Sequence, residues 1–204
     1  MGKQNTEIRQ EQLAQAALSL IASQGLAGLS VARVARRVGL VPSALYRHYS
    51  GKDALLDAVI ALIRKRLHGE VSAVMEQTSD PLDRLRRLLM AHVRVIRENE
   101  GILRIVFSDE LHHGQPGNKA VVYEMVGSYL RKVAGIVSRG QREGSIRGDL
   151  DPATVAVMFL GLIQPAAILW QLSGGRFNVT RHVKRAWPLF RAAISTGRSV
   201  LRMQ

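Results

Sequence analysis

The chain has 204 residues, 47% of them hydrophobic and 22% charged, so its composition excludes a disordered protein and allows a sizeable buried core. A formal net charge of +13 favours a polyanionic partner, with nucleic acid ahead of an acidic membrane surface. There is no cysteine, which excludes disulfides and thiolate chemistry and fits a reducing compartment. The sequence starts with polar and charged residues and shows no signal peptide, so we expect a cytoplasmic protein.

The hydrophobic spacing predicts an all-α protein of about nine helices, because apolar residues recur three and four positions apart. The first helix should end at Gly25, a natural left-handed cap. Ser30 can cap a second helix that Gly39 closes, and Pro42 suits the first position of a third helix of about two turns. A longer fourth helix, over residues 50–77, should connect this head to the rest of the chain.

Turn signals divide the remainder of the chain into five further predicted helices. They are expected from Asp80-Pro81 to Asn99, from there to near His113, from Lys119 to Arg142 after a loop at 114–118, from Pro152 to Leu172, and from a Thr180 cap to Arg198. Pro165 should kink the fourth of these, and Trp187-Pro188 should interrupt the last.

The second and third predicted helices have the layout of a helix-turn-helix, in which one helix crosses the DNA backbone and the next reads base edges. Leu45 and Tyr49 are four residues apart, so they fall on one face of the third helix and should anchor it. The remaining side chains point elsewhere and can meet DNA. Arg47 can fork onto a guanine or a phosphate, and Ala44 allows close approach to a thymine methyl group.

Two stretches of this region, LAQAALSLIASQGLAGLSVARVARRVGL and PSALYRHYSGKDALL, are similar to the TetR (tetracycline repressor-like) family of bacterial transcriptional regulators. Val41-Pro42 departs from the polar residues common there in the family. The resemblance implies a homodimer that binds a double-stranded DNA operator. The expected DNA-binding residues are Ser30, Arg33, Pro42, Ser43, Ala44, Tyr46, Arg47, His48 and Lys52. Among them Tyr46, His48 and Lys52 are expected to bind phosphate, the last beside the positive end of the fourth helix.

The resemblance also implies a division into a DNA-binding head at 1–51, a connecting helix at 50–77, and a ligand-binding and dimerising body at 78–204. Few charged residues can point inward in this body, so we expect a small apolar or amphipathic effector. The expected pocket residues, each of which also fits an ordinary core position, are Phe107, Met125, Tyr129, Met158, Phe159 and Trp170.

Residues 155–172 contain no formal charge and meet the lower length threshold for a membrane span. Gln164-Pro165 at the centre of the stretch, together with Gln171, favours a buried helix that packs partly against a second subunit. The last two predicted helices are therefore the expected dimer interface, which would place two recognition helices roughly 34 to 36 Å apart on a palindromic operator.

No arrangement of residues predicts catalysis, a cofactor or a metal site. His112-His113 has only Asp109 as a candidate partner, and adjacent residues on a helix diverge. The sequence thus predicts a non-enzymatic, sequence-specific, ligand-responsive regulator, acting as a repressor without a membrane partner. The alternatives are a nonspecific basic nucleic-acid-binding protein and an amphipathic membrane-associated protein, neither of which explains the spacing of Ser30, Gly39, Tyr46 and Lys52.

Overall fold

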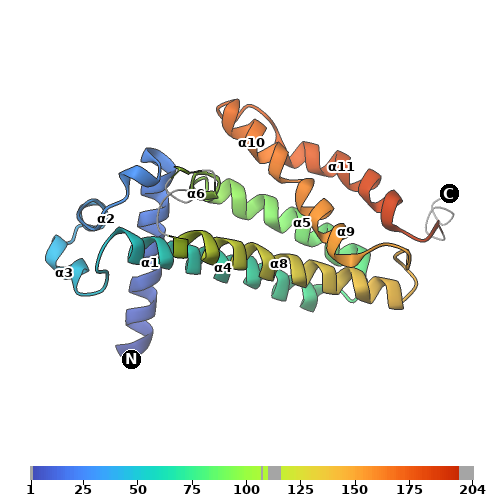
Figure 1. Ribbon diagram of the computed structural model, residues 1–204, viewed down its shortest axis with the longest axis horizontal. Helices are drawn as coiled ribbons and strands as arrows, with labels where there is room; N and C mark the ends of the chain where they lie inside the picture. The colour runs from blue at the N-terminus through green and yellow to red at the C-terminus, as the bar shows by residue number, and fades with distance from the viewer. Residues whose placement is uncertain (1, 107, 110–115, 198–204) are drawn as a thin grey trace. The chain divides into compact units, whose positions relative to one another are not determined.

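The computed structural model describes residues 2–106, 108–109 and 116–197 (Figure 1). Its elements are α1 (Gly2–Gln24), the 3₁₀ turn η1 (Leu26–Gly28), α2 (Val31–Arg37), α3 (Pro42–Tyr46), α4 (Lys52–Gln77), α5 (Pro81–Glu98), α6 (Gly101–Val106), α8 (Pro116–Arg142), α9 (Pro152–Gly161), α10 (Gln164–Leu172) and α11 (Val179–Ile194). Within these ranges the only β-structure is an isolated bridge between Ile146 and Ser195. With α9 and α10 counted as one interrupted helix, the all-α prediction of about nine helices is confirmed.

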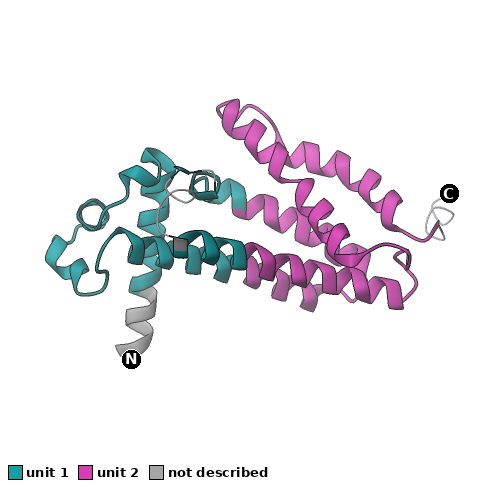
Figure 2. Cartoon of the chain, viewed as in Figure 1, with its two compact units in different colours: residues 1–66, 96–125 teal, residues 67–95, 126–204 magenta. Residues whose placement is uncertain are grey.

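The chain forms two compact units, residues 1–66 with 96–125 and residues 67–95 with 126–204 (Figure 2). Helices α4, α5 and α8 each contribute to both units, because the division falls inside them. The first unit therefore contains α6 and the start of α8 in addition to the N-terminal helices. The division into a head, a connecting helix and a body that is expected from the sequence stays a prediction, because the two compact units follow other boundaries.

In the first unit, α1 contacts η1, α2 and α6, and α2 contacts α3 (Figure 1). The core between them is aliphatic, and Ala17, Ile21, Val34 and Leu55 are fully buried. The contact between α1 and α6 is close: a Cβ atom placed on Gly101 would lie 2.7 Å from the carbonyl oxygen of Leu18. Glycine at the start of α6 is thus what allows the two helices to approach.

Polar contacts of α4 also connect the elements of the first unit. Arg66 donates from Nη2 to Oε1 of Gln15 on α1 at 2.6 Å, and from Nη1 to the side-chain oxygen of Asn99, just before α6. Lys65 pairs with Glu11 of α1 at 2.7 Å. Asn99 is buried, so its bond to a charged donor satisfies a polar group that water cannot reach. These contacts fix α1, α4 and α6 against one another.

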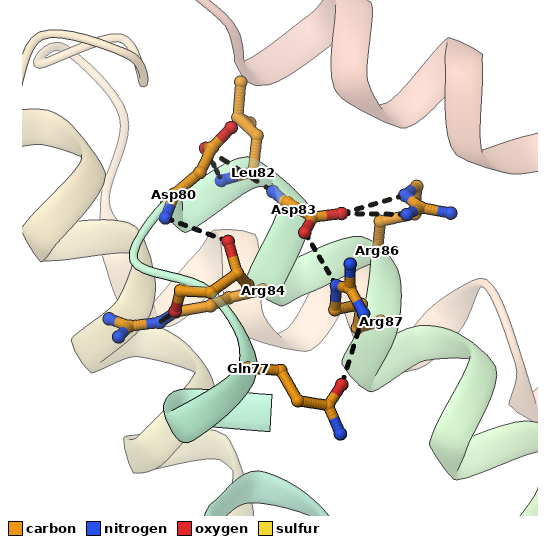
Figure 3. A network of polar contacts seen from close by, with 8 residues as sticks. Gln77, Asp80, Leu82, Asp83, Arg84, Arg86 and Arg87 are labelled. Atoms are coloured by element: carbon orange, nitrogen blue, oxygen red, sulfur yellow. Dashed lines mark hydrogen bonds and ion pairs between the residues drawn. The ribbon is translucent and has the colours of Figure 1, made fainter. Parts of the chain in front are cut away.

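In the second unit, a buried arginine caps the end of α4 (Figure 3). Arg84 of α5 donates from Nε to the carbonyl of Thr78 at 2.7 Å and from Nη2 to that of Met75 at 3.0 Å. Such carbonyls at a helix end have no partner within the helix. Asp80 accepts from the backbone N–H of Leu82 at 2.9 Å and so begins α5, as its position before a proline predicts.

Of the two prolines predicted to disturb a helix, one does so and the other does not. The helix expected from Pro152 to Leu172 breaks at residues 162–163, as Pro165 predicts, because a proline leaves the carbonyl four residues earlier without a donor. Pro188, by contrast, does not interrupt α11, and this prediction is wrong. Burial of Val183, Phe190 and Ile194 on one face holds that helix together across the proline.

Helix ends account for the other differences. The cap of α11 is Asn178, whose side chain accepts from the N–H of Arg181 at 2.9 Å, and not Thr180. The helix ends at Ile194, four residues before the predicted end. Helix α8 begins at Pro116, inside the predicted loop, because proline is well placed in a first turn. His112 and His113 lie outside the described residues.

Candidate nucleic-acid interface

The turn between α2 and α3 forms as its local sequence predicts. Ser30 caps α2, its hydroxyl accepting from the backbone N–H of Arg33 at 3.3 Å. Gly39 has φ +70°, a left-handed conformation that favours glycine, and the N–H of Leu40 donates to the carbonyl of Ala35 at 2.9 Å. Pro42 is the first residue of α3. Cap, glycine and proline together define where one helix ends and the next begins.

In α3 and the residues just after it, the predicted anchor residues are buried and the other side chains are exposed or partly exposed, as the helical spacing predicts. Leu45 and Tyr49 are buried, with exposed fractions of 1% and 7%, whereas Tyr46 is 55% exposed. The other outward residues are Pro42, Ser43, Arg47 and His48, and Ala44 is partly exposed. Burial of Tyr49 raises the pKa of its hydroxyl. The segment therefore presents mostly small, polar and basic side chains on one side, with its apolar anchors on the other.

Arg33 has a structural role beside its expected contact with phosphate. Its side chain donates from Nη1 to Oε1 of Gln24 at 2.8 Å and to the carbonyl of Gly28 at 3.2 Å. Gln24 is the last residue of α1 and Gly28 the last of η1, so the guanidinium secures the connection from α1 to α2 while remaining exposed. The neighbouring Arg36 and Arg37 are also exposed, on a helix whose described residues include no acid.

The start of α4 provides a second basic position in the same unit. Lys52 is the first residue of this helix, where the positive end of the helix dipole favours an anion. The next residue, Asp53, accepts from the side-chain amide of buried Asn118 at 3.3 Å, which links the first turn of α4 to that of α8. The first 68 residues carry ten Lys and Arg and four Asp and Glu, about +6 of the total charge of +13.

The expected pocket residues are distributed unevenly. Tyr129 and Phe159 are buried in the second unit and Trp170 is partly buried there, whereas buried Met125 belongs to the first unit. Met158 lies on the outer face of α9, 51% exposed, because the buried side of the helix is formed by its neighbours Val155, Phe159 and Leu160. Phe107 lies outside the described residues.

One buried polar residue of the second unit was not anticipated from the sequence. His92 is buried on α5, beside Tyr129 of α8, with a ring-centroid distance of 5.1 Å. It continues the inward series of Leu85, Leu88 and Leu89 at helical spacing. This spacing within an apolar face was the signal that could have identified it.

Comparison with known proteins identifies the fold and the interface. The family described as "Bacterial regulatory proteins, tetR family" matches residues 13–59, and "Tetracyclin repressor-like, C-terminal domain" matches residues 78–194, more than half of the chain. The chain belongs to the TetR family. It is a DNA-binding transcriptional regulator, and α2, the turn and α3 form the helix-turn-helix of this family. TetR-family regulators are DNA-binding proteins and not enzymes.

Similar proteins are found both by sequence and by structure. Nucleoid occlusion factor SlmA from Edwardsiella ictaluri is 28% identical over 192 residues, covering 92% of this chain and 96% of that protein. The fatty acid degradation regulator FadR from Bacillus halodurans has a TM-score of 0.75 at 18% identity, covering 96% and 97% of the two chains. FadR from Bacillus subtilis, in complex with stearoyl-CoA, has a TM-score of 0.75 at 20% identity, covering 90% and 98%. The two structures show the shared TetR-family fold.

Proposed function

We propose that this TetR-family protein is a cytoplasmic repressor that binds a palindromic operator as a homodimer and leaves it when a small apolar or amphipathic molecule binds the body. The DNA-binding part of the proposal rests on one observation: in α3 and the residues just after it, the apolar anchors are buried and the polar and basic side chains are exposed. Leu45 and Tyr49 are buried as anchors, while Ser43, Arg47 and partly exposed Ala44 remain available for base edges. The nine residues expected from the sequence to bind DNA form the proposed contact set.

The exposed apolar surface of the second unit supports a dimer formed through the last two predicted helices. Five large apolar side chains on α9, α10 and α11 are exposed: Val157, Met158, Leu169, Leu172 and Leu189. Large apolar side chains exposed on helices that contact one another indicate an interaction site on a protein in water. TetR-family proteins bind DNA as dimers, so a second copy of this chain is the proposed occupant.

The stretch Pro152–Leu172 is long and apolar enough to cross a membrane by length and composition, and 39% of it is buried in its own chain. Its break at residues 162–163 does not fit a span, because free backbone groups in the hydrocarbon layer need partners. A partner subunit can cover the exposed part of the stretch and supply such partners. We therefore assign this stretch to the dimer and not to a bilayer.

The proposed effector is apolar or amphipathic, with few charged groups. FadR from Bacillus subtilis, which shares the fold, forms a complex with stearoyl-CoA, a molecule with a long acyl chain. Release from DNA requires that the effector bind the DNA-incompetent state more tightly, by about 1.4 kcal/mol for each tenfold loss of occupancy. The residues of the second unit proposed to contact the effector are Tyr129, Phe159 and Trp170.

Genome-wide mapping of the sites bound by the purified protein tests this function. The expected result is a small set of promoter sites sharing a palindrome, and the regulated genes would indicate candidate effectors. Uniform occupancy without a motif would contradict the proposal and favour a nonspecific DNA-binding protein. The similarity to SlmA supports one alternative, that this protein is itself a nucleoid occlusion factor.

A further inference from the structure

Two polar side chains are buried side by side inside the second unit. His92 of α5 is 7% exposed and Tyr129 of α8 is 2% exposed, and their rings are tilted by 57° at a centroid distance of 5.1 Å. Each lies on the apolar side of its helix, His92 in the series Leu85, Leu88 and Leu89, and Tyr129 four residues before Val133. Neither belongs to the DNA-binding head. Their polar atoms therefore require an explanation that DNA binding does not provide.

Both residues carry a buried atom without a hydrogen-bond partner among the described residues, Nδ1 of His92 and the hydroxyl of Tyr129. A nearby polar pair of the same unit is already satisfied, since the hydroxyl of Ser128 lies 3.2 Å from Nε2 of His68. Buried polar groups in native proteins are nearly always paired, because an unpaired one loses its hydration without compensation. Two unpaired atoms on adjacent rings therefore call for a polar partner from outside the described residues.

The pair is uncharged near neutral pH. Burial lowers the pKa of His92 to about 4, which leaves the imidazole neutral with one donor and one acceptor nitrogen. Burial, and secondarily the charge of Glu70, raises the pKa of Tyr129, so the phenol keeps its proton. The negative charge of Glu70 also disfavours an anionic ligand group at this position. An uncharged group that can accept from a hydroxyl matches the pair best.

We propose that His92 and Tyr129 hold an uncharged carbonyl or hydroxyl group of an otherwise apolar effector, the Tyr129 hydroxyl donating to the ligand oxygen. The inference rests on the proposed response to a small molecule and specifies the polar chemistry of that molecule. Carboxylate-bearing ligands of the same length should bind more weakly, because the negative charge of Glu70 acts on the Tyr129 hydroxyl and would repel them. The apolar remainder of the ligand would meet the buried apolar side chains one helical turn from the pair, such as Leu88, Leu89 and Val133.

Binding of three probes of equal chain length tests the proposal: 2-nonanone, 1-nonanol and nonanoate, measured by calorimetric titration of the full-length protein. We expect the ketone and the alcohol to bind at least about tenfold more tightly than nonanoate. Tyr129→Phe removes only the hydroxyl and should weaken ketone binding about five- to tenfold, the usual value of one hydrogen bond. His92→Leu should weaken alcohol binding to a similar degree. Tyr123→Phe removes the same group from an exposed position on α8, 79% exposed, and should change nothing.

Thermal unfolding without any probe gives an independent test. If the Tyr129 hydroxyl is unpaired in the free protein, Tyr129→Phe should raise the melting temperature by about 2 to 4 °C, because it removes the cost of burying that group. The gain in stability should accompany the loss of ketone binding. A lower melting temperature would show that the hydroxyl has a permanent partner, such as an ordered water, and would overturn the proposal.

The remaining outcomes separate this inference from the proposed function. Equal binding of nonanoate, binding unchanged in both variants, or no binding of any probe would each overturn the role of the pair. 2-Nonanone could release the wild-type protein and both variants from the operator at the same concentration. This result would support the response to a ligand and contradict only the role of His92 and Tyr129. If the ketone binds as expected but operator occupancy never changes, the result contradicts the repressor mechanism and supports the site at His92 and Tyr129.

Discussion

At the scale of single residues, burial separates the side chains that hold the recognition helix from those that can read DNA. Leu45 and Tyr49 are inside the first unit, so substitutions there would affect folding of the head as a whole. Arg47 follows the last residue of α3 and is exposed, which leaves its guanidinium available for a bidentate contact. It is therefore the residue at which base readout can be tested without removing a core contact.

Arg47→Ala should weaken binding to the operator by about 1 to 3 kcal/mol and relax its sequence selectivity. Fluorescence anisotropy with operator and random duplexes over a range of salt concentrations measures both effects. Lys52→Ala is the matched control, because a phosphate contact at the start of α4 should weaken both duplexes alike and flatten the salt dependence. Unchanged selectivity in Arg47→Ala would show that this residue does not read bases.

His92 should make the stability of the protein depend on pH. Its pKa is lowered by burial from 6.5 to about 4, so in acid the unfolded chain binds a proton that the folded chain does not. The penalty is absent above pH 6.5 and grows as the pH falls toward 4, reaching about 3 kcal/mol. Urea unfolding of the wild type and His92→Leu at several pH values should show a gap that widens in acid in favour of the variant. Parallel curves would contradict this.

At the scale of secondary-structure elements, the packing of α1 against α6 depends on the absence of a side chain. In Gly101→Ala the new Cβ would lie 2.7 Å from both the carbonyl oxygen and a methyl group of Leu18, and backbone atoms cannot move as easily as a side chain. We expect a destabilisation of about 1 to 3 kcal/mol. Gly135→Ala, in the interior of α8 with no atom within 4 Å of its new Cβ, is the control and should stabilise by about 0.5 to 1 kcal/mol.

Chemical denaturation of both variants measures this difference. Equal stability of Gly101→Ala and the wild type would show that α6 can shift away from α1 without cost. Such a result would weaken the view that α1, α4 and α6 are fixed together in the first unit by Arg66 and its neighbours.

Elements defined by local signals could be predicted from the sequence, whereas those that depend on packing could not. The Ser30 cap, the left-handed cap at Gly25 and Pro42 at the start of α3 are set by residues close in the chain, and all three are confirmed. The continuity of α11 through Pro188 depends instead on burial of its apolar face. The exposure of Met158 and the position of His92 beside Tyr129 likewise depend on which helices pack together.

The candidate DNA interface was more predictable than the effector site for the same reason. The nine expected DNA-binding residues lie between positions 30 and 52, and their orientation follows from helical periodicity around two anchors. The expected pocket residues come from segments more than sixty positions apart and from both units. Apolar periodicity does not distinguish a residue that lines a pocket from one that fills a core.

At the scale of the whole molecule, operator binding should depend on dimerisation through α9, α10 and α11. Leu172 and Leu189 are 78% and 75% exposed in the single chain, and a second copy would bury them. A glutamate at either position would place a charge in an apolar interface with no partner, at a cost of several kcal/mol. Leu172→Glu and Leu189→Glu should therefore sediment as monomers at concentrations at which the wild type is a dimer.

The same two variants should lose operator affinity although their helix-turn-helix residues are unchanged. A monomer offers one recognition helix, so it forfeits the effective concentration that a dimer gives to its second half-site, about 10² to 10⁴ in affinity. Tyr123→Glu alters an equally exposed apolar side chain, 79% exposed but outside this surface, and should remain dimeric and fully active. If the leucine variants remain dimers, the dimer interface lies elsewhere. Binding of the wild type to anionic vesicles, lost in Leu172→Glu, would instead assign the surface to a membrane.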